Sequence, residues 1–325
     1  LEGRHPGLAG LVGGLAAVPP AGVFYTAVYT EAAYAAASLV GLAALAGSLR
    51  RGPARWWRPA DVVLAAVVAL TCAAAIRSNG ALHAAHLGVA AAVFAARRQV
   101  LPAVVAATGA ACVCLPTALL QWYGAAQYCS VPQPPSPSSS AWCPPHPTPA
   151  RLVDWLLPPP HYAHVQSTYW GVGFMTYWTP SQLPNWLLAA PMLVVVAYGV
   201  ALFTCDGLSA ARRSALAAQT AFLLSPVSPS APPCTHLPAV EQLVTHPLAV
   251  VCHVHLTVLA AVACLFGHVQ VITRLASPTP SLLILVAHAL TVPPWRRRAA
   301  AAWLTYVAAY TTFGTALFVR FYPWT

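Results

Sequence analysis

The sequence predicts an all-α polytopic membrane protein, on the evidence of its composition and of the order of its apolar and basic residues. Hydrophobic residues make up 58% of the 325 residues and charged residues only 7%. An average soluble domain has about 25% charged residues, so this composition cannot supply a water-facing surface. The apolar residues form long runs separated by short arginine clusters, which is the pattern of a chain that crosses a bilayer repeatedly.

Eight to nine apolar segments are expected in this chain. A helix needs about 20 apolar residues to span a bilayer. The candidate segments cover approximately residues 8–24, 27–49, 61–79, 82–96, 100–120, 185–205, 249–272, 281–294 and 299–320. The segments 82–96 and 281–294 are short, so half-inserted segments are the alternative to full spans there.

The basic residues predict the orientation. A net charge of +10 raises the question of nucleic-acid binding, but the arginines form short clusters instead of a stripe interleaved with aromatic residues. Nucleic acid is therefore not an expected partner. Positive residues are retained in cytoplasmic loops, and with the segments above every cluster falls on one side of the membrane: Arg50, Arg51, Arg55, Arg58, Arg97, Arg98, Arg212, Arg213, Arg296, Arg297 and Arg298.

Two connections differ in character. Residues 121–184, on the side opposite the arginine clusters, are rich in Trp, Tyr and Pro, which suits a folded segment at the membrane interface. Residues 206–249, on the arginine side, include a Ser/Pro-rich tract and are interpreted as a disordered linker. Cys129 and Cys143 flank a Pro/Ser stretch in the first connection and are disulfide candidates, with unpaired cysteines as the alternative.

Polar residues stand where the apolar runs end. The stretch HVQVITR (268–274) follows eighteen almost entirely apolar residues. An arginine inside a bilayer costs roughly 2.5 kcal/mol or more and so tends to face a cavity, a partner or an anionic ligand. The stretch is interpreted either as the last turn of a helix opening into a pocket or as two separate polar faces. For Arg274 alone, the alternative is a side chain that reaches to the headgroups.

The stretch RSNG (77–80) repeats this situation, because Arg77 ends an apolar run and Asn79-Gly80 then supplies a turn. A simple helix cap is one interpretation. The other is that Arg77 and Arg274 together hold a phosphate, which accepts forked hydrogen bonds from guanidinium groups.

The acidic residues are few. The histidines in apolar surroundings are interpreted as core or interface residues: His83, His86, His253, His255 and His288. Only Glu31 and Asp154 reach the side opposite the arginine clusters in the folded part, and Asp154 is interpreted as a loop residue. Glu31 begins an apolar helix, where the helix N-terminus favours a carboxylate. His253 and His255 lack an acidic partner and the chain has no CxxC pair, so no metal site is predicted.

A series of short motifs runs in order from about residue 19 to the end of the chain: PPAGVF (19–24), YTE (29–31), RSNG (77–80), QWY (121–123), AWCP (141–144), VQ (165–166), YWGVGF (169–174), QLPN (182–185), HVQVITR (268–274) and PWT (323–325). Their order and spacing closely resemble the PIG-V family, the GPI mannosyltransferases that add the second mannose during assembly of the glycosylphosphatidylinositol anchor.

The resemblance implies a GT-C-type transmembrane helix bundle in the endoplasmic reticulum membrane, with residues 1–325 forming a single transmembrane glycosyltransferase domain. It implies dolichyl-phosphate mannose as donor, a GPI precursor as acceptor, an α-1,6 linkage, an inverting mechanism and no cofactor. An accessory membrane subunit is left open. Donor and acceptor contacts are expected from residues in the matching motifs: Arg77, Asn79, Gln166, Tyr169, Trp170, Gln182, Asn185, His268, Gln270 and Arg274.

One departure from the family concerns the catalytic base. The family carries a Trp-Asp segment in its first lumenal loop, and no such dipeptide occurs in residues 1–325. The chain begins at Leu1 and is expected to start partway into a longer protein, or else its product is defective. The catalytic residue is therefore not identified from this chain. Glu31 is the lumenal acid that matches a family motif and is the candidate base that these residues offer, with Thr30 where the family usually has Ser. A membrane transporter and a noncatalytic membrane subunit are the alternative functions.

Overall fold

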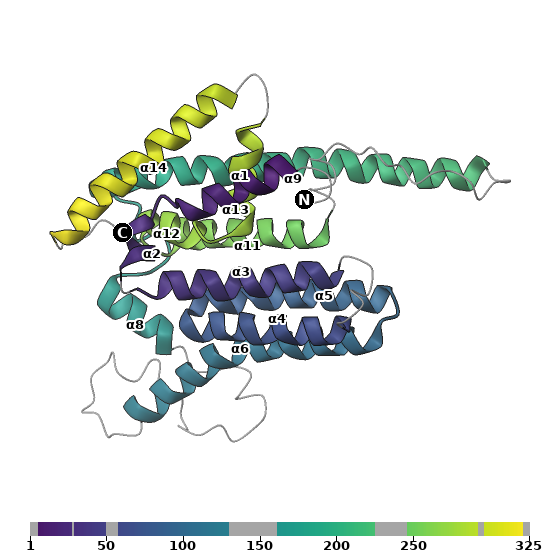
Figure 1. Ribbon diagram of the computed structural model, residues 1–325. Helices are drawn as coiled ribbons and strands as arrows, with labels where there is room; N and C mark the ends of the chain where they lie inside the picture. Colours follow the sequence, from purple (N-terminus) through teal and green to yellow (C-terminus); the bar gives the residue numbers. More distant parts are fainter. Residues whose placement is uncertain are drawn as a thin grey trace. The chain divides into compact units, whose positions relative to one another are not determined.

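The computed structural model describes residues 6–27, 29–49, 58–129, 161–224, 246–291 and 296–320. All regular structure within these ranges is helical (Figure 1), which confirms the predicted all-α class. The helices are α1 (Pro6–Ala17), α2 (Gly22–Thr26), α3 (Thr30–Leu49), α4 (Pro59–Ile76), η1 (Ser78–Leu82), α5 (His83–Ala96), α6 (Val100–Tyr128), α8 (His161–Trp170), η2 (Pro180–Gln182), α9 (Leu183–Leu224), α11 (Pro247–Leu265), η3 (Val269–Val271), α12 (Ile272–Ala276), α13 (Pro280–Ala289) and α14 (Arg296–Val319).

Seven helical segments of the described chain are long and apolar enough to cross a membrane: Glu31–Leu49, Pro59–Ile76, Ser78–Ala96, Val100–Tyr128, Pro180–Thr204, Pro247–Leu265 and Arg297–Val319. An eighth candidate is a bent pair, Val269–Ala276 and Pro280–Ala289, with an angle of 89° between its parts. The short predicted segment 281–294 belongs to this pair. A broken span or a re-entrant loop would have such a bend.

The first predicted segment, 8–24, is wrong as a single span. Helix α1 ends at Ala17, and a new helix begins only at Gly22. Pro19 and Pro20 stand between them. A proline lacks the N–H that a continuing helix needs, and it disfavours helical backbone in the residue before it.

The predicted linker is also partly wrong. Helix α9 continues to Leu224, so residues 206–224 are helical and not part of a linker without structure. This stretch is rich in alanine and contains leucine and arginine, which have high helix propensity. Residues 225–245, which include the Ser/Pro-rich tract, lie outside the described residues. At the other predicted connection, α6 extends to Tyr128 and α8 forms within 161–170.

The chain divides into two compact units. Unit 1 comprises residues 1–23, 186–261 and 272–325, and unit 2 comprises residues 24–185 and 262–271. Unit 2 contains α3, α4, η1, α5, α6 and α8, together with the last turn of α11 and the residues that follow it as far as the end of η3. The single transmembrane domain predicted for residues 1–325 stays a prediction.

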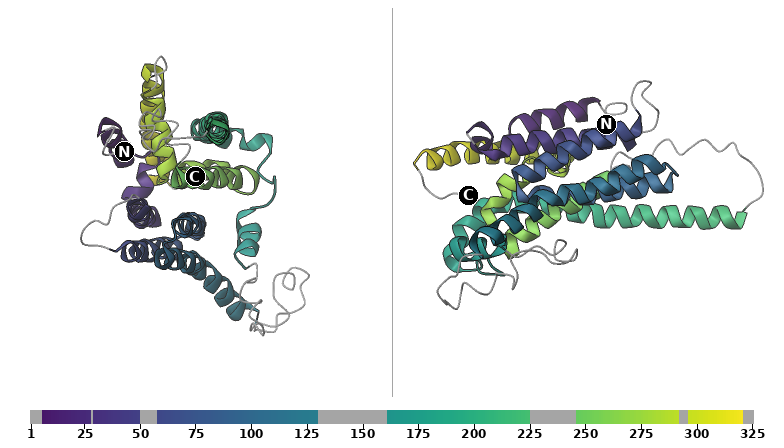
Figure 2. Two further views of the ribbon diagram at one scale, coloured as in Figure 1. Left: turned by 90° about the vertical axis from the view of Figure 1, so that its right-hand side faces the viewer. Right: turned by 90° about the horizontal axis from the view of Figure 1, so that it is seen from below.

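The centre of unit 2 is a group of four helices in which α4 packs against both α3 and α6, and α5 packs against α6 (Figures 1 and 2). Glycines allow two of these contacts to be close. A Cβ atom at Gly41 would lie 2.6 Å from Cγ of Leu70, and one at Gly109 would lie 2.2 Å from Cγ2 of Val67. Small residues bring membrane helices together in this way because lipid offers no hydrophobic drive for their association.

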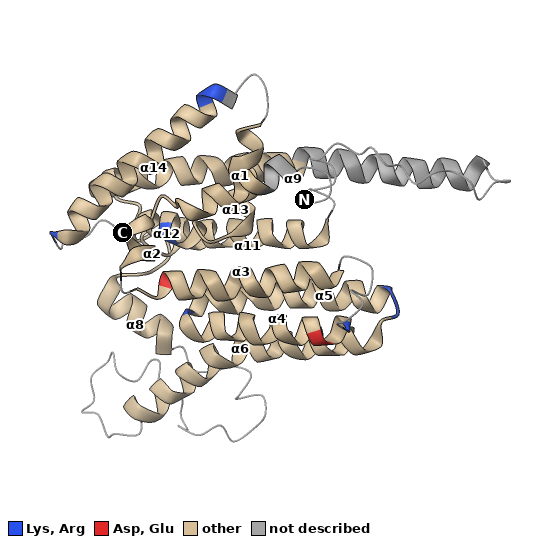
Figure 3. Cartoon of the chain, viewed as in Figure 1, with Lys and Arg blue, Asp and Glu red and all other residues tan. Residues whose placement is uncertain are grey.

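Both ends of this helix group carry charged residues. At one end, Arg97 donates from Nη1 to the carbonyl of Leu49 at 2.8 Å, so the end of α5 meets the end of α3. Arg58, which precedes α4, belongs to the connection that follows α3. At the other end, α3 begins, α4 ends and η1 follows. Among the helices that Figure 3 colours, the charged residues lie mostly near helix ends.

Unit 1 contains α1, nearly all of α9, most of α11, and α12 to α14, and α1 packs against α13. Its histidines take part in packing. His253 is buried and stacks on Phe203 with ring centroids 4.3 Å apart. The hydroxyl of Tyr198 lies 2.6 Å from Nδ1 of His288. These contacts confirm the interpretation of both as core or interface histidines.

Candidate functional site

Arg77 is anchored at the end of the unit 2 helix group where α3 begins and α4 ends. Its Nη1 donates to Oε1 of Glu31, which is 2% exposed, and lies 3.3 Å from Oγ1 of Thr30. Both contacts use the same guanidinium nitrogen. Among the described residues, Nε and Nη2 of Arg77 have no hydrogen-bond partner. We call Thr30, Glu31 and Arg77 the Arg77 site.

The backbone around Arg77 explains its position. Helix α4 ends at Ile76 because Arg77 adopts an extended backbone, with φ −146° and ψ 137°. The chain then folds back on α4, and a Cβ atom at Gly80 would lie 2.5 Å from Cα of Ala74. Only glycine permits that approach. The turn also buries Nδ2 of Asn79, for which the described residues offer no acceptor.

Helix α8 is tied to this end of the group by two hydrogen bonds. The hydroxyl of Ser78 donates to the hydroxyl of Tyr162 at 3.3 Å, and the backbone N–H of Tyr162 donates to Oε1 of Gln121 at 2.7 Å. The neighbouring His161 stacks on Tyr128, with ring centroids 5.7 Å apart. Burial, and to a smaller extent the neighbouring His164, lower the pKa of His161.

A second group of polar side chains surrounds Tyr177. Its hydroxyl accepts hydrogen bonds from Nδ2 of Asn185 at 2.9 Å and from Nε2 of Gln270 at 3.1 Å. Asn185 also donates to Oε1 of Gln182 at 2.6 Å. The ring of His268 meets the Tyr177 ring edge-on, with centroids 4.7 Å apart. We call these five residues the Tyr177 cluster.

His268 also ties this cluster to α8 by donating a hydrogen bond. Its Nε2 lies 2.9 Å from the backbone carbonyl of Trp170, the last residue of α8. A carbonyl oxygen only accepts hydrogen bonds, so Nε2 carries the hydrogen. Helix α8 thus bonds to Ser78 near its first residues and to His268 at its last. Residues 162 and 170 are about 12 Å apart along a helix at 1.5 Å per residue, so α8 links the Arg77 site to the Tyr177 cluster.

The segment 171–178 is held against the end of α11 by main-chain contacts. Gly173 N–H donates to the carbonyl of Phe266 at 3.0 Å, and Met175 N–H donates to that of Leu265 at 2.7 Å. Nε1 of Trp178 donates to the carbonyl of Cys264 at 2.8 Å. Gly171 and Met175 both adopt left-handed backbone, with φ of 62° and 58°. The left-handed Met175 is uncommon for a residue with a side chain.

The structure brings five of the predicted contact residues together around Tyr177: Trp170, Gln182, Asn185, His268 and Gln270. Arg77 and Asn79 lie at the end of α4. Gln166 and the exposed Tyr169 lie on α8, where the Gln166 carbonyl accepts from Val172 N–H.

Arg274 belongs to α12 in unit 1 and is half-buried. Of the two disulfide candidates, Cys129 is disulfide-bonded, and Cys143 lies outside the described residues. Asp154 lies outside them as well. The pairing of Cys129 with Cys143 stays a prediction.

The interpretation of HVQVITR as the last turn of a helix is wrong. Helix α11 ends at Leu265, and the chain forms the separate short helices η3 and α12 after Gly267 and His268. Gly267 favours this break, since glycine destabilises a continuing helix. The result is a buried Gln270 whose Nε2 reaches Tyr177 and whose Oε1 has no partner among the described residues.

Two tyrosines that make these contacts are not among the residues that the sequence predicts for the site. Tyr177 lies in an aromatic stretch that predicted only a membrane interface, and its hydrogen bond to Gln270 spans 93 residues of sequence. Tyr162 bonds to Ser78 across 84 residues. Nothing in the local pattern around either tyrosine carries a signal for such distant partners.

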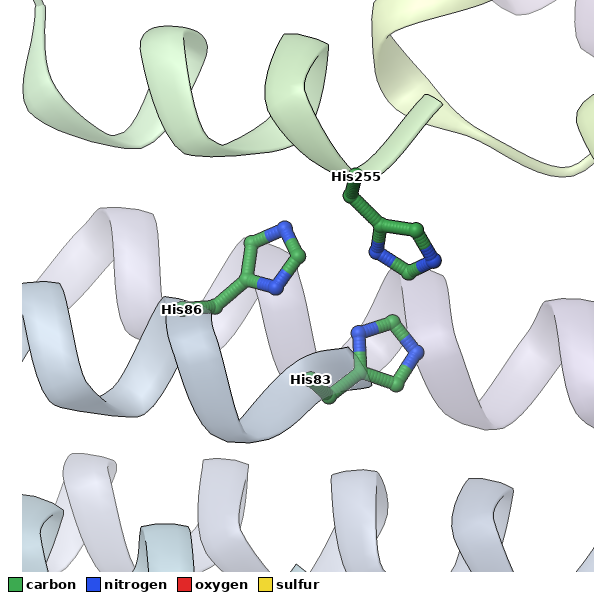
Figure 4. Close-up of side chains that lie close together, drawn as sticks. All are labelled: His83, His86 and His255. Atoms are coloured by element: carbon green, nitrogen blue, oxygen red, sulfur yellow. The ribbon is translucent and has the colours of Figure 1, made fainter. Parts of the chain in front are cut away.

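The histidines of α5 lie in the interior of unit 2. His83 Nε2 is 2.9 Å from Oγ of Ser38, and its ring stacks on Tyr34 with centroids 6.0 Å apart. The rings of His83 and His86 are 5.3 Å apart, and both project from α5 in Figure 4, which also draws His255 of unit 1. His83 and His86 are both buried, in agreement with their interpretation as core or interface histidines.

Comparison with known proteins identifies relatives along nearly the whole chain. GPI mannosyltransferase 2 of Gibberella zeae is 28% identical over 312 residues, which is 94% of this chain and 64% of the relative. GPI mannosyltransferase 2 of Drosophila pseudoobscura is 33% identical over 189 residues, 57% of this chain and 35% of the relative. GPI alpha-1,6-mannosyltransferase 2 of Cricetulus griseus is 30% identical over 208 residues, 55% of this chain and 37% of the relative.

The chain spans less than two thirds of the length of each of these relatives. No solved structure matches it. Residues 14–325 match a family described as mannosyltransferase (PIG-V), and this range includes both the Arg77 site and the Tyr177 cluster. The chain therefore belongs to the PIG-V mannosyltransferase family.

Proposed function

We propose that this protein transfers the second mannose, in α-1,6 linkage, from dolichyl-phosphate mannose to the GPI-anchor precursor at the lumenal face of the endoplasmic reticulum membrane. Family membership and the names of the relatives support this activity. The observation that carries the assignment of a site is Arg77. Its guanidinium is anchored through Nη1 alone and keeps two further nitrogens without partners among the described residues.

The reaction needs such a group. A β-linked donor that yields an α-linked product reacts by a single inverting displacement, in which a base assists the acceptor hydroxyl. The bond to the lipid phosphate breaks, and negative charge grows on the departing dolichyl phosphate. Nε and Nη2 of Arg77 can donate forked hydrogen bonds to that phosphate and stabilise the developing charge.

The Tyr177 cluster is suited to sugar hydroxyls. Asn185, Gln182 and Gln270 carry amides, which both donate and accept hydrogen bonds, as sugar hydroxyls require. The buried Oε1 of Gln270 and Nδ2 of Asn79 have no partner among the described residues and are the polar atoms that a ligand would satisfy. We assign the cluster to donor or acceptor sugar contacts and include no cofactor in the proposal.

Two other functions are not favoured. A transporter or a noncatalytic membrane subunit would also account for apolar helices with polar residues at their ends. Neither accounts for a family match that covers residues 14–325. Location in the endoplasmic reticulum is the part of the proposal that follows from the pathway, and the proposal requires no accessory membrane subunit.

The test is rescue of cells that lack the second GPI mannosyltransferase, using the complete gene. The unchanged gene should remove the accumulated one-mannose precursor. Arg77→Ala should lower rescue by about tenfold or more, the value of a lost charge-assisted hydrogen bond of about 1.5–3 kcal/mol. Arg98→Ala, an arginine at the opposite end of the helix group, is the matched control and should rescue fully. Persistence of the precursor with the unchanged, well-expressed gene would contradict the proposed activity.

A further inference from the structure

We propose that Glu31 is a positioning residue, which acts through Arg77 and aims its guanidinium at the anionic group of the substrate. The sequence offers Glu31 as the candidate base, and the contacts of the described chain favour a different role. This inference rests on the proposed function, because it needs Arg77 to bind the lipid phosphate. Glu31 then sets how that arginine is presented.

The first argument is the way the two side chains meet. Glu31 is the second residue of α3, and Arg77 directly follows the last residue of α4. Oε1 of Glu31 and Oγ1 of Thr30 both accept a hydrogen bond from Nη1 of Arg77. Both anchors therefore hold Nη1 of the guanidinium. The opposite edge, Nε and Nη2, faces away from Glu31 and Thr30 and is left to bind a ligand.

The second argument is that the local backbone fixes where the side chains of Glu31 and Arg77 start. The N-terminus of α3 favours a carboxylate in its first turn, where Glu31 stands. The turn at Ser78–Leu82 is held on α4 by the close approach of Gly80 to Ala74. A long arginine side chain loses conformational freedom when it binds a ligand, so one that is already held binds more tightly.

The third argument concerns access. A catalytic base must come within hydrogen-bond distance of the acceptor hydroxyl. Glu31 is 2% exposed, and its Oε1 is already bonded to a guanidinium. A sugar hydroxyl would have to displace Arg77 to reach that oxygen. The side chain of Arg77 is the more exposed partner, at 18% against 3% for Glu31, so a ligand approaching the pair meets the arginine first.

The experiment measures binding of dolichyl phosphate to the complete protein in lipid nanodiscs, together with kcat and donor KM. Glu31→Gln should weaken dolichyl phosphate binding and raise donor KM by about 3- to 10-fold, the range expected for loss of one ionic anchor. Electrostatics alone predicts the opposite, because removing a negative charge beside an anion site strengthens anion binding. The direction of the change thus separates positioning from simple charge.

The matched control is Asp61→Asn. Asp61 also stands in the first turn of its helix, at the opposite end of the group, and should change neither quantity. Thr30→Val removes the other anchor without changing charge and should give a smaller effect in the same direction as Glu31→Gln. If Glu31→Gln does not fold well enough to be purified, Thr30→Val still tests the inference.

Two results would overturn the inference. One is unchanged or tighter dolichyl phosphate binding in Glu31→Gln or, if that variant is absent, in Thr30→Val. The other is a loss of kcat of about 100-fold or more with donor KM unchanged, the pattern of a lost base. A separate result addresses the proposed function: if Arg77→Ala binds dolichyl phosphate as well as the unchanged protein, Arg77 is not a phosphate contact.

Discussion

Arg77 illustrates how a single residue acquires a role that its sequence position does not specify. The sequence places it at the end of an apolar run and offers a cap or a phosphate contact. The structure adds an acidic partner 46 residues earlier in the chain. That partner depends on the packing of α3 against α4, and local patterns carry no information about side chains that meet over such separations.

At the same scale, Tyr177→Phe should destabilise the protein by about 1–3 kcal/mol. The change removes the oxygen that accepts from both Asn185 and Gln270, and it leaves a buried amide donor unsatisfied. The measurement is thermal unfolding in detergent, monitored by fluorescence-detected gel filtration. Tyr123→Phe, which alters an exposed tyrosine of α6, is the control and should leave the transition unchanged. Equal transitions for all three proteins would show that the Tyr177 hydroxyl contributes nothing to stability.

Most elements follow from the sequence, because long apolar runs without charge form helices in a membrane protein. Their ends follow less well. Pro19 and Pro20 divide the first predicted segment, and an alanine-rich stretch carries α9 on to Leu224. A window of apolar residues weighs composition over about 20 residues, whereas proline stops a helix at one position and alanine propensity extends it into polar sequence.

Also at the scale of elements, Gly109→Ala should weaken the contact between α4 and α6. The new Cβ would lie 2.2 Å from a methyl carbon of Val67, and overpacking of this kind costs about 1–3 kcal/mol. The thermal transition should fall in Gly109→Ala and recover in part in the double variant with Val67→Ala. Gly88→Ala in α5, where a Cβ atom meets nothing within 4 Å, is the matched control. If Gly88→Ala and Gly109→Ala unfold at the same temperature, the packing of α4 against α6 does not depend on this close approach.

On the scale of the whole molecule, the arginine clusters predict which helix ends share a side of the membrane. Arg97 and the end of α3 meet in the structure, in agreement with that pattern. Within unit 2, the Arg77 site lies at the opposite end of these helices, where α3 begins and α4 ends. Charge pattern therefore predicts the side on which the candidate site lies, while the pairing of residues within it depends on tertiary packing.

Glycosylation-site tagging tests this arrangement. Acceptor sequons placed beside Asn79 and beside His268 should both be glycosylated, because the orientation predicted from the arginine clusters and the proposed location put both turns on the lumenal side. A sequon in the turn at Arg98 should stay unmodified. Modification of only one of the first two tags would place the Arg77 site and the Tyr177 cluster on opposite faces, and no shared substrate would then reach both.

The division of unit 2 into two stretches of chain has a consequence for biosynthesis. Its last ten residues, 262–271, follow the 76 residues of unit 1 that separate them from Asn185. A ribosome therefore releases Arg77 and Tyr177 into the membrane well before Gln270 and His268 exist. Nascent chains that stop short of residue 262 would present Tyr177 with a single amide donor, and the segment 171–178 would wait without its main-chain partners until translation reaches the end of α11.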